Sequence, residues 1–184
     1  MACDLTLGRK EPCKDVVGGI KNIYFVDFGD LTLTFDSTDT DVIESVGSSV
    51  ANFKYEVKGN SSLEQTVNSS RENGTTFYEQ TLNLTLKKLS KEDNKELKLL
   101  AYGRPHVAVE DYNGNVMVVG LEHGADVSGG TVVTGAAMGD LSGYTLTLTG
   151  METKPANFVA SPTSADPYAG MSSATVTVTS GSDW

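Results

Sequence analysis

The sequence is poor in the side chains that most enzymes and metal proteins use. Its 184 residues include two histidines and two cysteines, and Cys3 and Cys13 do not form a Cys-x-x-Cys pair. Zinc sites, disulfide frameworks and most catalytic centres need more of these side chains or a closer spacing. We therefore expect no catalytic residue, no metal ligand and no cofactor. Two reduced thiols are the expected state, with a local Cys3–Cys13 bridge as the alternative.

Motifs that carry catalysis or phosphate binding are also missing. No Gly-x-Ser-x-Gly or His-Glu-x-x-His pattern occurs. Residues 124–131 imitate a phosphate loop, but Gly130 stands where the lysine is required. Residues 111–115 resemble the start of a calcium loop, yet they lack the later bidentate glutamate, and a hairpin turn explains them. The sequence predicts that the protein is not an enzyme.

Long apolar runs and excess basic charge are absent as well. No stretch approaches the length of a membrane span, and the N-terminus lacks the basic and apolar regions of a secretion signal. We expect a cytosolic origin and no contact with a membrane. The 24 acidic residues exceed the 14 basic residues, which gives a net charge of −10 and argues against binding to nucleic acid.

The acidic residues are unevenly distributed. Between Asn22 and Phe53 there is no lysine or arginine. This span contains six acidic side chains, namely Asp27, Asp30, Asp36, Asp39, Asp41 and Glu44. Such a distribution predicts one strongly negative face or loop, which is either a solvated surface without a task or a functional one.

Period-two alternation is the dominant pattern in the chain. Residues 143–150 place Tyr144, Leu146 and Leu148 on one face and threonines on the other. Asn113-Gly114 between two apolar runs predicts a hairpin over 107–119. Further strands are expected over 20–28, 31–35, 53–57 and 77–86. One helix is expected over 91–102, with Ser90 as its N-cap and Gly103 after its end.

These elements predict a mainly β protein of one domain, a β-sandwich or half-barrel with one flanking helix. Residues 1–19 form an N-terminal arm, 20–159 the β domain and 160–184 a C-terminal tail. The polar segment 58–76 is either a functional loop or a protruding hairpin. A last strand over 174–179 is expected to pair away from the main sheet, on a neighbouring molecule, because three prolines precede it.

The central stretch resembles a known family. Gly120-Leu121-Glu122-His123-Gly124, followed by residues 135–150, is similar to the pattern G-L-E-N-G … T-G … D-x-x-G-Y-x-x-T-x-x-G of tail tube proteins of long-tailed bacteriophages. Residues 3–25 are similar to the start of phage virion structural proteins of the same kind. His123 departs from the pattern, which often has asparagine there. The residues that carry the resemblance are Gly120, Gly124, Gly135, Asp140, Gly143, Tyr144 and Gly150.

The resemblance implies a virion protein that assembles in the cytoplasm of the host bacterium. Six copies would form a ring, and rings would stack into a tail tube that conducts genomic DNA without binding it specifically. Other copies and other tail proteins would be the partners. The six acidic residues named above are candidates for the lumen. The candidates for contact between rings are Asn60, Leu63, Glu64, Val67 and Arg71.

Two other functions stay open on the sequence alone. A carbohydrate-binding or adhesin-like β-sandwich would use Tyr112, Tyr144 and Trp184 as a sugar platform. Another tail component, such as a terminator or a hub protein, would share the strand pattern and assemble differently.

Overall fold

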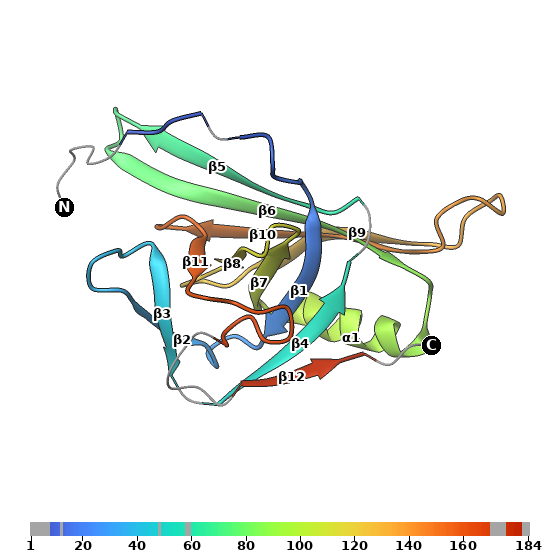
Figure 1. Ribbon diagram of the computed structural model, residues 1–184. Coiled ribbons are helices and arrows are strands. Elements are labelled where there is room, and N and C mark those ends of the chain that lie inside the picture. The colour runs from blue at the N-terminus through green and yellow to red at the C-terminus, as the bar shows by residue number, and fades with distance from the viewer. Residues whose placement is uncertain (1–7, 12, 48, 58–59, 170–175, 182–184) are drawn as a thin grey trace.

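The computed structural model describes residues 8–11, 13–47, 49–57, 60–169 and 176–181. In these residues the chain forms two β-sheets and one helix, as Figure 1 shows. The prediction of a mainly β fold with one flanking helix is confirmed.

The larger sheet has eight strands. They are β1 (Ile20–Val26), β2 (Thr32–Phe35), β3 (Val42–Gly47), β4 (Val50–Glu56), β7 (His106–Asp111), β8 (Val116–Val119), β11 (Asn157–Val159) and β12 (Val176–Ser180). Their order is β12-β4-β1-β7-β8-β11-β3-β2, so β2 and β12 are the edges. The β3–β11 and β4–β12 pairs are parallel, and the other pairs are antiparallel.

The smaller sheet is antiparallel and has four strands. They are β5 (Ser62–Ser70), β6 (Thr75–Lys87), β9 (Asp126–Val133) and β10 (Gly143–Glu152). Their order is β5-β6-β10-β9, so β5 and β9 are the edges.

The central strands of the larger sheet are apolar on both faces. In β1, Ile23 and Phe25 face the smaller sheet, whereas Tyr24 and Val26 face the opposite side, and all four are buried. In β7, Val107 and Val109 face the smaller sheet and Ala108 faces the opposite side, and the valines of β8 also divide between the two sides. A strand covered on both sides reads as a continuous apolar run, which is the pattern that the sequence shows at 23–26.

Two cores result from this arrangement. The intersheet core lies between the two sheets and includes Leu82, Leu84 and Leu148. The half-barrel core lies on the other face of the larger sheet. It receives side chains from both edge strands, Leu33 of β2 and Val178 of β12. Because opposite edges contact one core, the larger sheet is curled into a half-barrel.

The C-terminal segment belongs to the half-barrel core. Tyr168 is fully buried there, and β12 pairs with β4 of the same chain, with Val176 opposite Val50. The prediction that this strand pairs on a neighbouring molecule was wrong. The prolines that suggested it, such as Pro162 and Pro167, lie in the connection before the strand and leave its hydrogen bonds intact.

Helix α1 (Lys91–Tyr102) has the bounds that the sequence predicted. The Ser90 side chain accepts a hydrogen bond from the Asp93 N–H at 2.9 Å, which satisfies one of the free donors of the first turn. The N–H of Gly103 closes the last turn by donating to the carbonyls of Leu99 and Leu100. Leu97 is buried and Leu100 packs against the intersheet core, so the helix flanks the sandwich.

The predicted hairpin is confirmed as β7 and β8, with Val107 opposite Val119. Gly114 has φ +84 in the turn, where glycine is favoured. The Asn113 side chain also binds the backbone of Val17 twice, at 2.9 and 2.8 Å. These two bonds fasten the end of the N-terminal arm to the hairpin.

Of the two alternatives for the polar segment 58–76, the structure has the hairpin. β5 pairs with β6 from Ser62 opposite Asn83 to Ser70 opposite Thr75, around a turn at 71–74. Figure 1 shows this hairpin projecting away from the larger sheet. Its far half has no core beneath it, because Val67 on the core side of β5 is 57% exposed.

We predict that Tyr168→Ala lowers the free energy of unfolding by about 3–5 kcal/mol, because it opens a cavity in the half-barrel core. Tyr168→Phe is expected to be neutral or stabilising, because the buried hydroxyl has no hydrogen-bond partner. Urea denaturation followed by circular dichroism measures both variants. Tyr102→Ala, at a position 80% exposed, is the control. A small loss in Tyr168→Ala would show that the segment does not contribute to the core.

Candidate functional site

The structure divides the acidic span between two places. Asp27 and Asp30 lie in the turn between β1 and β2, whereas Asp36, Asp39 and Asp41 lie in the turn between β2 and β3. Glu44 lies on β3 and is exposed. The four residues of β2 separate the two turns by roughly 13 Å. The acidic span is therefore not one loop, because its residues lie in two turns and on β3.

Hydrogen bonds within the turn explain why Asp36 and Asp39 are aspartate. Oδ1 of Asp36 accepts the N–H groups of Thr38 and Asp39 at 2.6 and 3.1 Å. These bonds, with Thr38 the stronger influence, lower the pKa of the Asp36 carboxyl group below its usual value. Oδ1 of Asp39 accepts the N–H of Asp41 at 3.1 Å. Aspartate is favoured in such turns for its local hydrogen bonds alone.

The residues expected to contact a neighbouring ring lie along the β5–β6 hairpin. Glu64 and Val67 are exposed on β5, and Arg71 is exposed at the turn. Leu63 is half-buried and packs against the intersheet core, so it is a core residue and not a free contact. Asn60 precedes the strand, and its carbonyl accepts a hydrogen bond from Thr85 at 3.0 Å.

The glycines of the central motif have a structural reason to be glycine. Gly120 and Gly124 have φ +69 and +80, and a Cβ on Gly124 would lie 2.3 Å from the Arg104 carbonyl oxygen. A Cβ on Gly143 would lie 2.0 Å from the carbonyl oxygen of Leu86, across the β6–β10 pair. These positions allow backbones to approach more closely than any side chain permits. Gly150 also lies against the motif turn, near the Gly124 carbonyl.

The other motif residues shape the β9–β10 hairpin. Gly135 has φ +76. Oδ2 of Asp140 accepts the N–H groups of Ala136 and Ala137 at 2.9 and 2.7 Å, which closes the loop. Tyr144 is buried, and its hydroxyl donates to the Ser90 carbonyl at 3.0 Å.

The burial of Tyr144 weakens the carbohydrate-binding alternative. A sugar platform needs an exposed ring, and of the two proposed aromatic residues that the structure describes, Tyr112 is exposed and Tyr144 is not. Trp184 lies outside the described residues.

The clearest surface feature is the face of the smaller sheet that points away from the intersheet core. We call it the outer face. Most of its side chains are polar. They include Glu64, Thr66, Asn68, Phe77, Glu79, Thr81, Asn83, Thr85, Lys87, Asp126, Ser128, Thr131, Val133, Thr145, Thr147, Thr149 and Met151.

Hydroxyl groups pair across the strands of the outer face. Thr131 and Thr145 lie 2.6 Å apart, and Ser128 and Thr149 lie 2.9 Å apart, in each case between side-chain oxygens. Lys87, at the end of β6, is the one basic residue in the four strands. The outer face is therefore largely hydrophilic and carries a net negative charge. Sequence reasoning found its threonines on β10 but not the face itself, because that face depends on which strands are neighbours.

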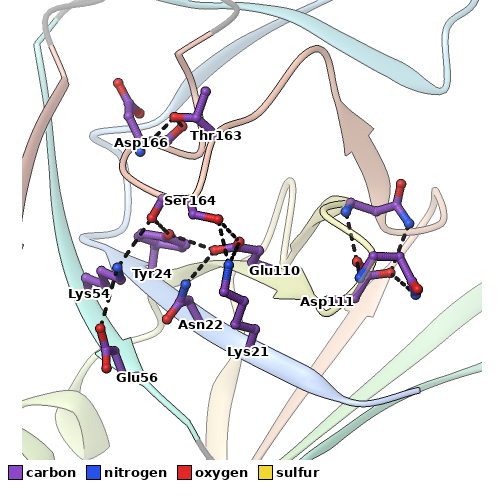
Figure 2. Close-up of polar contacts among 12 residues, drawn as sticks. Lys21, Asn22, Tyr24, Lys54, Glu56, Glu110, Asp111, Thr163, Ser164 and Asp166 are labelled. Carbon is purple, nitrogen blue, oxygen red and sulfur yellow. Dashed lines mark hydrogen bonds and ion pairs between the residues drawn. The ribbon is translucent and has the colours of Figure 1, made fainter. Parts of the chain in front are cut away.

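A second polar cluster surrounds Glu110 of β7, as Figure 2 shows. One carboxylate oxygen accepts hydrogen bonds from Lys21 at 3.1 Å and from the Ser164 hydroxyl at 2.7 Å. The other oxygen accepts from Asn22 at 2.6 Å and from the Tyr24 hydroxyl at 3.0 Å. Glu110 itself is buried. Sequence reasoning missed this cluster, because its members are up to 143 residues apart.

The cluster holds the C-terminal segment in place. Burial by itself raises the pKa of Glu110, but the hydrogen bonds from Asn22, Ser164, Lys21 and Tyr24 outweigh it and lower the pKa below its usual value. A carboxylate held by four donors is a weak base. The arrangement is therefore better suited to fastening Ser164 than to activating it as a nucleophile.

Two grooves lie beside α1. One, of about 620 Å³, is lined by β4, α1 and β12, and carries Lys54, Lys88, Glu92 and Glu96. The other, of about 530 Å³, lies between α1 and the β9–β10 pair and is mostly apolar. Neither groove is lined by histidine or cysteine.

The comparisons with known proteins give no relative. No protein family model, no curated protein and no solved structure matches the chain. Among the described residues, the structure has no helix that is long and apolar enough to cross a membrane.

We predict that Glu110→Gln lowers the free energy of unfolding at pH 7 by about 1–3 kcal/mol, because a charged acceptor of four hydrogen bonds is lost. The pKa of Glu110 is lowered in the folded state. Its stabilisation is therefore complete above the unfolded pKa of about 4.3 and is lost as the pH falls toward the folded value. Urea denaturation from pH 7 to pH 3 should show the two proteins converging below about pH 4.

Glu72→Gln, in the exposed turn of the β5–β6 hairpin, is the control and should stay close to the wild type throughout. A difference between Glu110→Gln and the wild type that does not change with pH would contradict the role assigned to the carboxylate charge.

Proposed function

We propose that this protein is a structural subunit of a bacteriophage tail tube. Copies join side by side through the edges of the smaller sheet, close into a ring of six, and stack into a tube that conducts genomic DNA. The resemblance of residues 120–150 to tail tube proteins motivates the proposal. The observation that carries it is the pair of long edge strands on the smaller sheet.

These edges differ from those that monomeric proteins have. β5 has nine residues and β9 has eight, and neither contains lysine or proline. A free edge strand is usually kept short, or is protected by lysine, proline or a covering segment. The edges of the larger sheet follow that rule, because β2 has four residues and β12 has five. The edges of the smaller sheet are longer, and the features that protect them are Glu64 on β5 and Asp126 and one bulge on β9. Pairing with another copy is the simplest way to satisfy their remaining backbone groups.

Pairing β9 of one copy with β5 of the next gives a head-to-tail interface that closes into a ring. Each copy contributes the four strands of the smaller sheet. About 24 strands, spaced ~4.8 Å apart and tilted by ~40°, close a cylinder roughly 48 Å across. Such a cylinder is wide enough to pass a DNA duplex.

The outer face is the proposed lining of the bore. The opposite face of the smaller sheet is covered by the larger sheet. In a closed ring of copies the larger sheet must therefore lie on the outside of the ring, and the face that we call the outer face must line the bore. Glu64, Glu79 and Asp126 give this lining a negative charge. DNA binds where cationic groups displace its counterions, so a negative and hydroxyl-rich wall lets DNA slide without binding. The outer face replaces the acidic turns as our candidate for the lumen.

Contacts between rings are assigned to the two projecting hairpins. In Figure 1 the β5–β6 hairpin and the β9–β10 loop extend in opposite directions. Each carries an exposed apolar side chain, Val67 on the first and Met138 on the second. Segments that reach beyond a ring on opposite sides suit contact with the rings above and below.

The test is assembly of the purified protein, followed by light scattering and negative-stain electron microscopy at rising concentration. We expect rings or tubes from the wild type. The double variant Val67→Lys/Val132→Lys, which places a charge on each edge strand, should stay monomeric. Both valines are exposed in the subunit, so its thermal unfolding should change little.

The matched control is Leu99→Lys/Tyr102→Lys, which adds the same charge at exposed positions of α1 and should still assemble. Rings that never stack would identify a tail terminator in place of a tube subunit. A wild type that stays monomeric at every concentration, or an edge variant that assembles like the control, would reject the proposal.

A further inference from the structure

Three potential metal ligands meet at the central motif. Glu122 and His123 lie in the turn that joins β8 to β9, and Glu152 is the last residue of β10. Their ligand atoms all lie within 4.8 Å of one another. Nothing in the tube proposal uses this cluster.

Glu152 is the fixed part of the cluster. Its side chain is fully buried, and one carboxylate oxygen accepts the N–H groups of Glu122 and His123 at 3.1 and 2.8 Å. The second oxygen faces Nδ1 of His123 at 3.1 Å. A buried carboxylate needs a compensating positive charge. Among the ion pairs of the described residues, its one partner is His123, which is charged only when protonated.

The geometry of this pair also accommodates a metal ion. Nitrogen and oxygen ligands bind zinc at about 2.0–2.2 Å, which at a tetrahedral angle places the two ligand atoms roughly 3.3 Å apart. The distance from His123 Nδ1 to the Glu152 oxygen is 3.1 Å, so little movement is required.

Glu122, the third ligand, is held by two residues outside the cluster. One oxygen of Glu122 accepts the Thr153 hydroxyl at 3.0 Å, and the other lies 3.7 Å from the Lys154 ammonium group. Metal-binding carboxylates are generally held by such outer hydrogen bonds. Lys154 is half exposed on a flexible side chain, so it can give way when an ion binds.

We propose that Glu122, His123 and Glu152 bind a divalent first-row transition metal ion, with Zn²⁺ as the reference ion. One imidazole and two carboxylates form a mixed nitrogen and oxygen set that suits zinc and leaves a fourth position to water. The bound ion joins the motif turn to the end of β10. The site is missed by sequence reasoning because His123 and Glu152 are 29 residues apart and meet only through the fold.

The test is calorimetric titration of the full-length protein with ZnCl₂, in a Cys3→Ser/Cys13→Ser background so that thiols do not contribute. We expect one ion per chain, with a rise in the thermal unfolding temperature that EDTA reverses. Co²⁺ should give the intense visible absorption of a tetrahedral site. His123→Asn and Glu122→Gln should each weaken Zn²⁺ binding more than tenfold, and Thr153→Val should weaken it less.

Glu122 and His123 are exposed, so these two variants should fold normally, which near-ultraviolet circular dichroism checks. Glu72→Gln is the matched control and should bind Zn²⁺ like the wild type. The proposal is overturned if the protein binds no Zn²⁺, or if His123→Asn and Glu122→Gln bind it as tightly as Glu72→Gln does. Ring assembly is measured separately, so failure of either proposal leaves the other standing.

Discussion

The three central strands β1, β7 and β8 are buried on both faces, and the rest of the structure follows from that constraint. A sheet that is buried on both faces needs two covers. One cover comes from the larger sheet itself, which curls so that β2 and β12 contact the same core, with Tyr168 filling it. The other cover is the smaller sheet, whose leucines face β1 and β7. Local features such as the glycine motif and the Glu110 cluster serve this arrangement by bringing its parts together.

The smaller sheet covers one face of the larger sheet, but its own edge strands stay uncovered. It extends past the core, and its free face carries threonines, asparagines and carboxylates in place of apolar side chains. Its border strands are long and contain neither lysine nor proline, two residues that often protect a free edge. We propose that these edges pair with other copies, which would form a closed wall around a hydrophilic channel.

Local sequence patterns predicted the helix and the hairpins. The features that they did not predict depend on which strands are neighbours in the sheets. The helix at 91–102 and the Asn113-Gly114 hairpin appear as expected, because capping and turn chemistry lie within a few residues. The acidic span looked like one face but is split, because sequence proximity does not show that β2 separates the two turns. The outer face and the contacts of Glu110 depend on strands brought together from distant parts of the chain. No local pattern could show them.

The central claim is that β5 and β9 are completed by neighbouring copies. Hydrogen exchange of backbone amides, compared between dilute and concentrated protein, tests it most directly. Amides of β5 and β9 that exchange quickly in the dilute subunit should become protected together on assembly, while those of β2 and β12 change little. If the protein assembles while the amides of β5 and β9 keep the same exchange rates, the interface lies elsewhere and the account is wrong.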